Sequence, residues 1–221
     1  MKNRRMKLIS CALAVCLACG AAGVSIAYMT DAHEKTNVIT VGNVDIDLTE
    51  PTWNPDDGKN VLPRETVSKN PQITNNGSLA CWAYMRVTSP IKNIQTVDNG
   101  TKRKKPAAPT ELFSWNVNDG WELISQETAA DGSAVHYVYA YKTLLESGKT
   151  TQSLFDNVTM TNYLEGQIDK NEGLNIPVQA VAIQQYVDES ENGTPDLKQI
   201  YKQYLSQETY NKKEAEDNNV E

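Results

Sequence analysis

The sequence predicts an all-β protein, an antiparallel β-sandwich that is followed by a C-terminal amphipathic helix. Three observations carry this prediction: short segments in which apolar and polar residues alternate, Gly, Pro, Asn and Asp between those segments, and one late stretch with helical periodicity. With 221 residues, of which 39% are apolar, the chain is long enough to bury a core. We divide it into a signal peptide (1–27), a β-sandwich domain (28–187), and a helix with an acidic, disordered tail (188–221).

The first 27 residues have the composition of an export signal. Basic residues near the start precede a run without charge at positions 8–29. Ser25 and Ala27 suit a signal peptidase site, so cleavage would leave Tyr28 as the first residue, and the chain would contact a membrane only before cleavage. Two alternatives remain: an uncleaved membrane anchor, and a lipoprotein modified at Cys16 or Cys19, whose flanking residues fit that modification poorly.

The first half of the sandwich is predicted to contain three strands. They cover residues 38–48, 65–74 and 79–88. Between the second and third strands, the turn at 75–78 contains an Asn-Gly pair, which is typical of a tight hairpin. Side chains alternate along residues 79–88, so Cys81 is expected on the apolar face of that strand.

Five further strands are predicted in the second half of the sandwich, and glycine-containing turns separate several of them. The strands cover residues 112–117, 121–126, 135–143, 152–160 and 176–187, and the turns lie at 119–120, 131–132 and 147–148. The last strand is apolar on both faces, which predicts a central position in a sheet with both faces covered.

A helix is predicted after the last strand. Thr194 and Pro195 suit its N-cap and first turn, and apolar residues then recur at helical spacing: Leu197, Ile200, Tyr201, Tyr204 and Leu205. We expect this helix to pack on the sandwich, the alternative being a helix that binds a partner. After Gln207 the chain is polar and acidic, and we predict disorder there.

Cysteine usage gives one expectation about the core. Cys11, Cys16 and Cys19 lie in the signal peptide, so Cys81 is left alone and no internal disulfide is possible after cleavage. We interpret Cys81 as a small buried residue, and an intermolecular disulfide is the alternative.

The sequence contains no recognisable catalytic motif. His33 lacks the second histidine that the helical motif of zinc proteases requires, and the chain has no G-x-S-x-G stretch. His136 lies on a predicted strand, where we interpret it as solvent-facing or packed on the sheet. We therefore predict no catalytic, cofactor-binding or metal-binding residues and no enzymatic activity.

Two further side-chain patterns are interpreted as structural. The acidic pairs, Asp45 with Asp47 and Asp56 with Asp57, do not continue into the loop of a calcium site. Tyrosines align on one face of the strand at 135–143, where cross-strand packing is the first interpretation and a surface for sugar rings or a partner is the alternative: Tyr137, Tyr139 and Tyr141.

The net charge of the chain and one basic loop bear on which partners it could bind. Beyond residue 27 the chain has 17 basic and 28 acidic residues, a net charge of −11, which argues against nucleic acid as a partner. One loop is basic, with Lys or Arg at each of the positions 102–105. We interpret this loop as an exposed, soluble connection, and contact with an anionic wall polymer is the alternative.

Three motifs near the N-terminus follow one another directly: residues 27–31, the Thr36-Asn37 pair and residues 41–48. In these motifs the chain resembles the TasA/camelysin family. Later stretches also resemble the family, although Arg64 and the Ser147-Gly148 pair depart from Pro-Gly dipeptides that are common in it. The resemblance implies a jelly-roll-like sandwich whose signal peptide is removed by a dedicated endoplasmic-reticulum-type signal peptidase. It also implies secretion to the extracellular matrix or cell surface.

Fibre-forming members of this family polymerise by lending an N-terminal strand to the next subunit. Here cleavage would release residues 28–37, with Tyr28, Met29 and Thr30 at the start of the donor strand. Self-association into filaments, or joining related fibre subunits, is therefore the expected role; the alternative is that this segment folds back on its own sheet. Two other functions stay open: an accessory protein that anchors such fibres, and a camelysin-like metalloprotease of the cell surface.

Overall fold

The computed structural model describes residues 43–54, 56–58, 61–169, 174–184 and 195–217, with side chains of the last segment described as far as Gln207. The strands in this part of the chain are β1 (Ile46–Thr49), β2 (Thr66–Ser68), β3 (Gln72–Asn75), β4 (Cys81–Ile94), β5 (Ala108–Glu111), β6 (Phe113–Trp115), β7 (Trp121–Thr128), β8 (Ala134–Tyr141), β9 (Asn157–Met160) and β10 (Val178–Gln184). They are followed by the helix α2 (Leu197–Asp217). None of the described helices is long and apolar enough to span a membrane.

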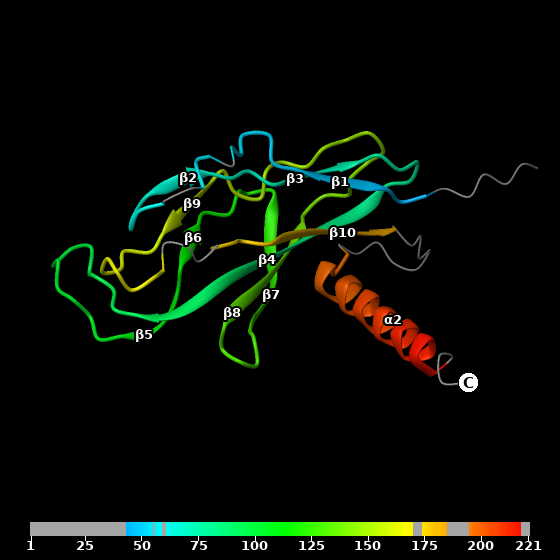
Figure 1. Ribbon diagram of the computed structural model, residues 1–221. Helices are drawn as coiled ribbons and strands as arrows, with labels where there is room; N and C mark the ends of the chain where they lie inside the picture. The colour runs from blue at the N-terminus through cyan, green and yellow to red at the C-terminus, as the bar shows by residue number, and fades with distance from the viewer. Residues whose placement is uncertain (1–42, 55, 59–60, 170–173, 185–194, 218–221) are drawn as a thin grey trace, which may run out of the picture. The chain divides into compact units, whose positions relative to one another are not determined.

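The strands form two layers around one core (Figure 1). One layer has the strand order β10-β4-β8-β7, with β5 paired to the far half of β4. The other layer contains the pair β1-β3 and the sheet β2-β9-β6. All pairs between the described strands are antiparallel, and side chains from both layers share one buried cluster that includes Ile73, Met85, Leu154, Phe155 and Val158. The predicted all-β antiparallel sandwich is confirmed.

The opposite face of the β10-β4-β8-β7 sheet is covered by α2. Leu197 and Tyr201 of the helix are buried in a second cluster, together with Tyr84 of β4, Ile124 of β7 and Ala140 of β8. The hydroxyl of Tyr84 donates a hydrogen bond to the carbonyl of Leu197 (3.1 Å). The C-terminal helix and its packing on the sandwich are thus as predicted, because the apolar spacing of 3.6 residues places these side chains on one stripe.

Two predicted strand positions are wrong for reasons of backbone chemistry. The segment 65–74 is divided into β2 and β3, which pair with different partners, and Pro71 lies at the division because proline has no N–H to donate. The predicted strand 79–88 continues to Ile94. It passes through Pro90 because β10 pairs with β4 before this residue and β5 pairs after it.

The predicted hairpin at residues 75–78 is not formed, because β3 pairs with β1 and not with β4. Instead, the backbone N–H groups of Asn76 and Gly77 donate to the carbonyl of Asp45, at 2.8 and 3.0 Å. A Cβ at Gly77 would lie 2.5 Å from the carbonyl oxygen of Asn43 and 2.7 Å from the amide nitrogen of Asp45. Glycine is therefore required at position 77 because two backbone segments approach each other closely there, and not because the chain forms a hairpin turn.

Other boundaries also differ from the predictions. The first strand covers 46–49, so it shares only 46–48 with the predicted residues 38–48, of which 38–42 lie outside the described residues. β5 was not predicted, because its short, proline-containing sequence has weak strand propensity. α2 continues to Asp217, where disorder was predicted after Gln207, since Glu, Lys and Ala favour helix despite their polarity. The turns at 119–120, 131–132 and 147–148 are present as predicted.

Candidate functional site

The last strand, β10, lies at an edge of its sheet and not in the centre as predicted. Both its faces are covered, but among the described strands it pairs only with β4. The amide of Thr88 donates to the carbonyl of Pro177 (3.0 Å), which fixes the alternation of bonded residues along this pair. It follows that the backbone groups of Val178, Ala180 and Ala182 point away from β4, toward the free edge.

The outer edge of β1 also has no paired neighbour, since among the described strands β1 pairs only with β3. The bond from the amide of Asn76 to the carbonyl of Asp45 sets the alternation in the β1-β3 pair, so the backbone groups of Ile46 and Leu48 point away from β3. β1 and β10 belong to different layers and pack their side chains against the same core cluster, and Figure 1 shows the two strands one above the other. We call the outward backbone groups of Ile46, Leu48, Val178, Ala180 and Ala182 the open seam.

The other edge of the large sheet is built differently. β7 has a register shift between Leu123 and Ser125, which is a β-bulge, and it carries the exposed carboxylates Glu122 and Glu127. Bulges and charges are devices that discourage the addition of another strand. β10 has no charged residue and pairs regularly with β4 along all seven of its residues. Of these two edges, β10 is the one suited to accept a strand.

The residues that the sequence predicts for export and strand donation lie outside the described residues. These are the cleavage residues Ser25, Ala27 and Tyr28 and the donor residues Tyr28, Met29 and Thr30. The described chain starts a few residues before β1, whose free edge is part of the open seam.

His136 is exposed on β8, and its Nδ1 lies 3.1 Å from the hydroxyl of Thr88 on the neighbouring strand. This agrees with the predicted solvent-facing side chain. His33 lies outside the described residues. Within the described segments, no three His, Cys, Asp or Glu side chains are close enough together to hold a metal ion. Neither acidic pair, Asp45 with Asp47 or Asp56 with Asp57, belongs to such a group of three among the described residues.

Cys81 is fully buried in the main core cluster, as predicted. Its backbone exchanges two hydrogen bonds with Leu145, at 3.0 and 2.9 Å. Burial raises the pKa of the Cys81 thiol above its ordinary value, so the reactive thiolate is disfavoured. A disulfide between chains would require this strand to leave the core, and the intermolecular alternative is therefore not supported by the structure.

The tyrosine stripe of β8 packs inside the sandwich. Tyr139 is buried and its hydroxyl accepts a hydrogen bond from the indole N–H of Trp115 (3.1 Å). Tyr137 meets Trp115 edge to face at 5.3 Å between ring centroids, and its hydroxyl donates to the carboxylate of Glu111. Tyr141 packs on Trp121 at 5.0 Å. The cross-strand packing interpretation is confirmed, and the stripe offers no open platform for a sugar ring.

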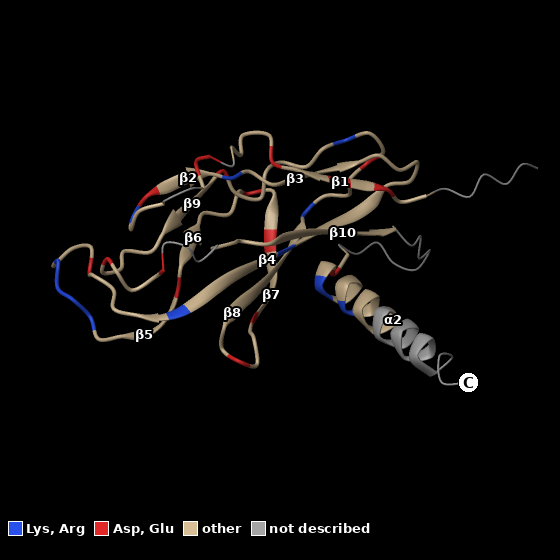
Figure 2. Cartoon of the chain, in the orientation of Figure 1, with Lys and Arg blue, Asp and Glu red and all other residues tan. Residues whose placement is uncertain are grey.

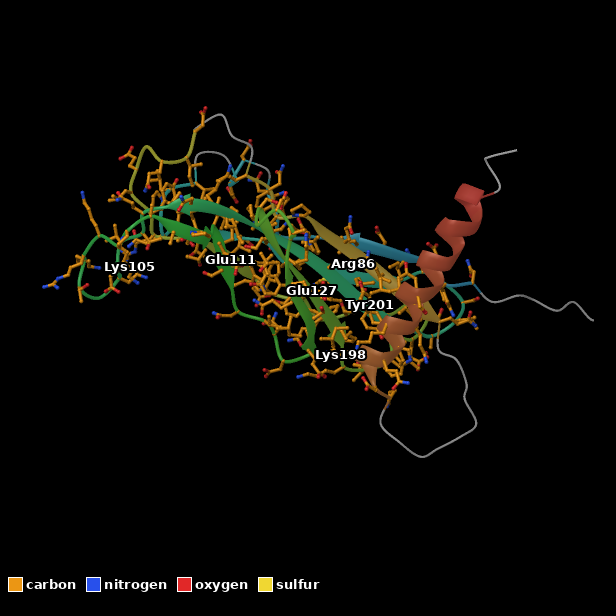
Figure 3. The ribbon with its side chains drawn as sticks, turned by 90° about the horizontal axis from the view of Figure 1, so that it is seen from below. Arg86, Lys105, Glu111, Glu127, Lys198 and Tyr201 are labelled. Atoms are coloured by element: carbon orange, nitrogen blue, oxygen red, sulfur yellow. The ribbon has the colours of Figure 1, made fainter. Side chains whose placement is uncertain are left out.

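Arg86 makes a polar contact with α2 that the sequence did not predict. It lies on the outer face of β4, where its Nε donates to the hydroxyl of Tyr201 on α2, and its guanidinium lies 5.5 Å from the Tyr201 ring centroid. Figure 3 shows the two side chains together where the helix crosses the sheet. An arginine among outward-facing strand residues was the available signal, but its partner is more than a hundred residues away in the sequence.

The basic loop lies at the tip of an arm formed by residues 91–111, which includes the far half of β4 and β5 (Figure 2). Its residues 102–105 are exposed, and Lys105 makes an ion pair of 3.5 Å with Asp98. Hydrogen bonds from Thr101 hold the pKa of Asp98 at about 2, so this carboxylate stays charged at neutral pH. Beside the arm is a groove of about 370 Å³ whose lining includes Arg64 and Asn99.

Comparison with known proteins identifies one family. Residues 1–172 match the family described as camelysin metallo-endopeptidase, which covers the predicted signal peptide and the chain as far as the segment after β9. No curated protein and no solved structure matches the sequence significantly. Since the match extends over more than half of the residues, it confirms the resemblance that the N-terminal motif indicated. The chain belongs to the camelysin family.

Proposed function

We propose that this protein is an exported, non-catalytic structural subunit of the cell surface or extracellular matrix, which polymerises by strand donation. After signal cleavage, the new N-terminal segment of one copy would add to the open seam of the next. The observation that carries this proposal is the uncharged and regular edge of β10 beside the edge of β1, since neither edge pairs with another strand among the described residues. Family membership supports it, since fibre-forming relatives of the TasA/camelysin type use the same kind of joint.

The physical basis of the joint is main-chain hydrogen bonding. An added strand would satisfy the outward N–H and C=O groups of Val178, Ala180 and Ala182, each bond contributing about 0.5 to 1.5 kcal/mol net. The donor segment and the seam are different surfaces of the same chain, so the contact is heterologous. A heterologous contact that does not close into a ring produces a filament.

The experiment compares two purified chains, one with residues 28–221 and one that begins at Val38. Size-exclusion chromatography and negative-stain microscopy should show filaments only for the longer chain. If the longer chain remains monomeric at high concentration, the donor segment folds back on its own sheet or stays unused, and self-polymerisation is wrong. If it joins fibres only in the presence of another fibre subunit, the accessory role replaces the proposal.

A second candidate function comes from the description of the matched family, which is a metallo-endopeptidase. That activity implies a metal ion, and the described residues do not fit one, because they bring no three potential ligands together. The discriminating measurement is hydrolysis of casein by the pure protein, with and without a chelator. Chelator-sensitive hydrolysis that is lost in His33→Ala or His136→Ala would establish the protease and overturn the non-catalytic proposal.

A further inference from the structure

The groove beside the arm is polar, and its lining is neutral except for one arginine. Besides Arg64, the lining includes the hydroxyl and amide side chains of Asn99, Ser114, Thr159, Thr161 and Asn162. None of the described residues that line it is acidic or aromatic. The arm is held against this region by paired backbones, since the amide of Val97 donates to the carbonyl of Asn162 (2.9 Å). The groove is therefore a fixed feature of the folded arm.

Several hydrogen-bonding groups in the groove are already used, and others are not. The side-chain amide of Asn162 donates to Val97 and to the Oδ1 of Asn99, both at 2.9 Å. In the described part of the chain, the guanidinium of Arg64, the side-chain amide nitrogen of Asn99 and the hydroxyl of Ser114 make no hydrogen bond within the protein. The free groups are thus mainly donors, which suits a ligand rich in acceptor oxygens.

Two residues, one that lines the groove and one at the tip of the arm, have a backbone conformation that side chains disfavour. Arg64 has φ of 72° and Lys102 has φ of 59°, and these are the described non-glycine residues with positive φ. Arg64 follows Pro63 in a turn closed by the amide of Glu65 and the carbonyl of Leu62 (3.0 Å), a position where glycine is favoured. The Nζ of Lys102 donates to the carbonyl of Asn99, which lines the same groove.

Backbone strain of this kind concentrates at functional sites, because glycine would be the unstrained choice elsewhere. Here both strained positions carry a cation. The tip adds Arg103, Lys104 and Lys105, against one carboxylate, Asp98, that pairs with Lys105. Figure 2 shows this basic stretch at the end of the arm, and Figure 3 shows Lys105 far from the Arg86 and Tyr201 contact. A local excess of positive charge therefore stands on a chain of net charge −7.

We propose that the groove and the basic tip bind a polyol-phosphate polymer, a chain of hydroxylated units joined by phosphodiesters. The guanidinium of Arg64 presents paired donors to a phosphate, and the lysines of the tip attract neighbouring phosphates. The hydroxyl and amide groups match the hydroxyls of the units between them. Single-stranded nucleic acid carries the same phosphates but is bound by stacking bases on aromatic rings, which the groove lining lacks. This binding does not depend on filament formation.

The test measures binding of poly(glycerol phosphate) to the purified protein by calorimetry at low salt. Arg64→Gly should weaken binding roughly tenfold, as expected for the loss of a charge-assisted contact, and it should not lower the midpoint of thermal unfolding, because glycine accepts the positive φ. The double variant Arg103→Gln, Lys104→Gln should also weaken binding and reduce its salt dependence. Lys149→Gln removes one exposed charge from a turn that does not line the groove and is the matched control.

Three results would overturn the proposal. One is the absence of measurable binding of poly(glycerol phosphate) by the unaltered protein. Another is an equal loss in Lys149→Gln and Arg64→Gly, which would mean that net charge and not the groove governs binding. The third is equal or tighter binding of single-stranded DNA with the same number of phosphates, which would identify nucleic acid as the partner.

Discussion

Asn75 is the residue whose loss should most clearly test how the N-terminal strand is held. It is fully buried, and its side-chain amide donates to the carbonyls of Leu79 (2.8 Å) and Leu145 (2.9 Å). Its Oδ1 accepts a hydrogen bond from the amide of Gly77 (3.0 Å). One side chain thus connects the end of β3, the segment before β4 and the loop after β8. The same segment supports β1, which forms part of the open seam.

The expected cost of Asn75→Ala follows from these three hydrogen bonds. At about 1 kcal/mol net for each, the free energy of unfolding should fall by about 3 kcal/mol. We expect no larger loss of unfolding free energy, because two of the three partners keep a second hydrogen bond. The carbonyl of Leu145 also accepts from the amide of Cys81, and the amide of Gly77 also donates to the carbonyl of Asp45. Urea unfolding followed by tryptophan fluorescence would measure the loss.

In a second variant, Asn75→Asp, the loss of stability should depend on pH. The aspartate keeps the acceptor for Gly77 but faces two carbonyl oxygens without a proton, so burial and these oxygens raise its pKa in the folded state. A raised carboxyl pKa destabilises the fold above the unfolded pKa, and the penalty shrinks as pH falls and the acid is protonated. Exposed Asn76, mutated to Ala, should change stability by less than about 0.5 kcal/mol. A loss below about 1 kcal/mol in Asn75→Ala, or an equal loss in Asn76→Ala, would refute the reasoning.

Three further predictions concern the core and the backbone. Cys81 should react with a thiol reagent only on unfolding, and rapid labelling of the native protein or a disulfide-linked dimer on non-reducing gels would contradict its burial. Burial raises the pKa of Tyr84 above its ordinary value near 10, so the unfolding free energy should fall as pH rises above about 10, because the unfolded chain loses a proton that the fold retains. Tyr84→Phe should make this alkaline loss shallower, and an unchanged pH profile would argue against it. Gly77→Ala should cost about 2 kcal/mol in denaturant unfolding, since its Cβ would lie 2.5 Å from a backbone oxygen, whereas Gly100→Ala, with 3.6 Å to its nearest atom, should be tolerated.

Local patterns in the sequence predicted the fold class well. The sequence predicted strands at residues 121–126 and 135–143 and a turn at Asp131-Gly132, and the structure joins β7 and β8 into a hairpin there, with a positive φ of 70° at Gly132. Helical spacing from Leu197 to Tyr204 predicted the stripe of α2 that packs on the sheet. In both cases the information lies within a few residues of the structure that it specifies.

Which segments of the chain pair with each other could not be predicted from local patterns. Asn76-Gly77 has the composition of a hairpin turn, yet Gly77 is required where two backbones approach each other, a contact between segments more than thirty residues apart. Both faces of β10 are apolar, which indicates cover on each face but says nothing about whether a neighbour bonds to its edge. The open seam therefore became visible only in the strand order.

The groove beside the arm illustrates the same limit. Its residues come from the turn at Arg64, the loop at Asn99, β6 and the end of β9, which the sequence separates widely. The basic positions 102–105 were visible as a charged run, but a charged run alone is equally consistent with solubility. The signal that was available at Arg64 was local: an arginine directly after Pro63, where a turn of this kind favours glycine.

The most direct test of the proposed assembly blocks the free edge of β10 without disturbing the fold. The N–H of Ala180 points away from β4, so Ala180→Pro should leave the β4 pairing intact and prevent another strand from adding. Gln126→Pro places the same change at an outward position of β7 and is the matched control. Negative-stain microscopy of the chain 28–221 should show filaments for the unaltered chain and for Gln126→Pro, and monomers with a nearly unchanged melting temperature for Ala180→Pro. Filaments of Ala180→Pro as abundant as those of the unaltered chain would contradict strand addition at β10.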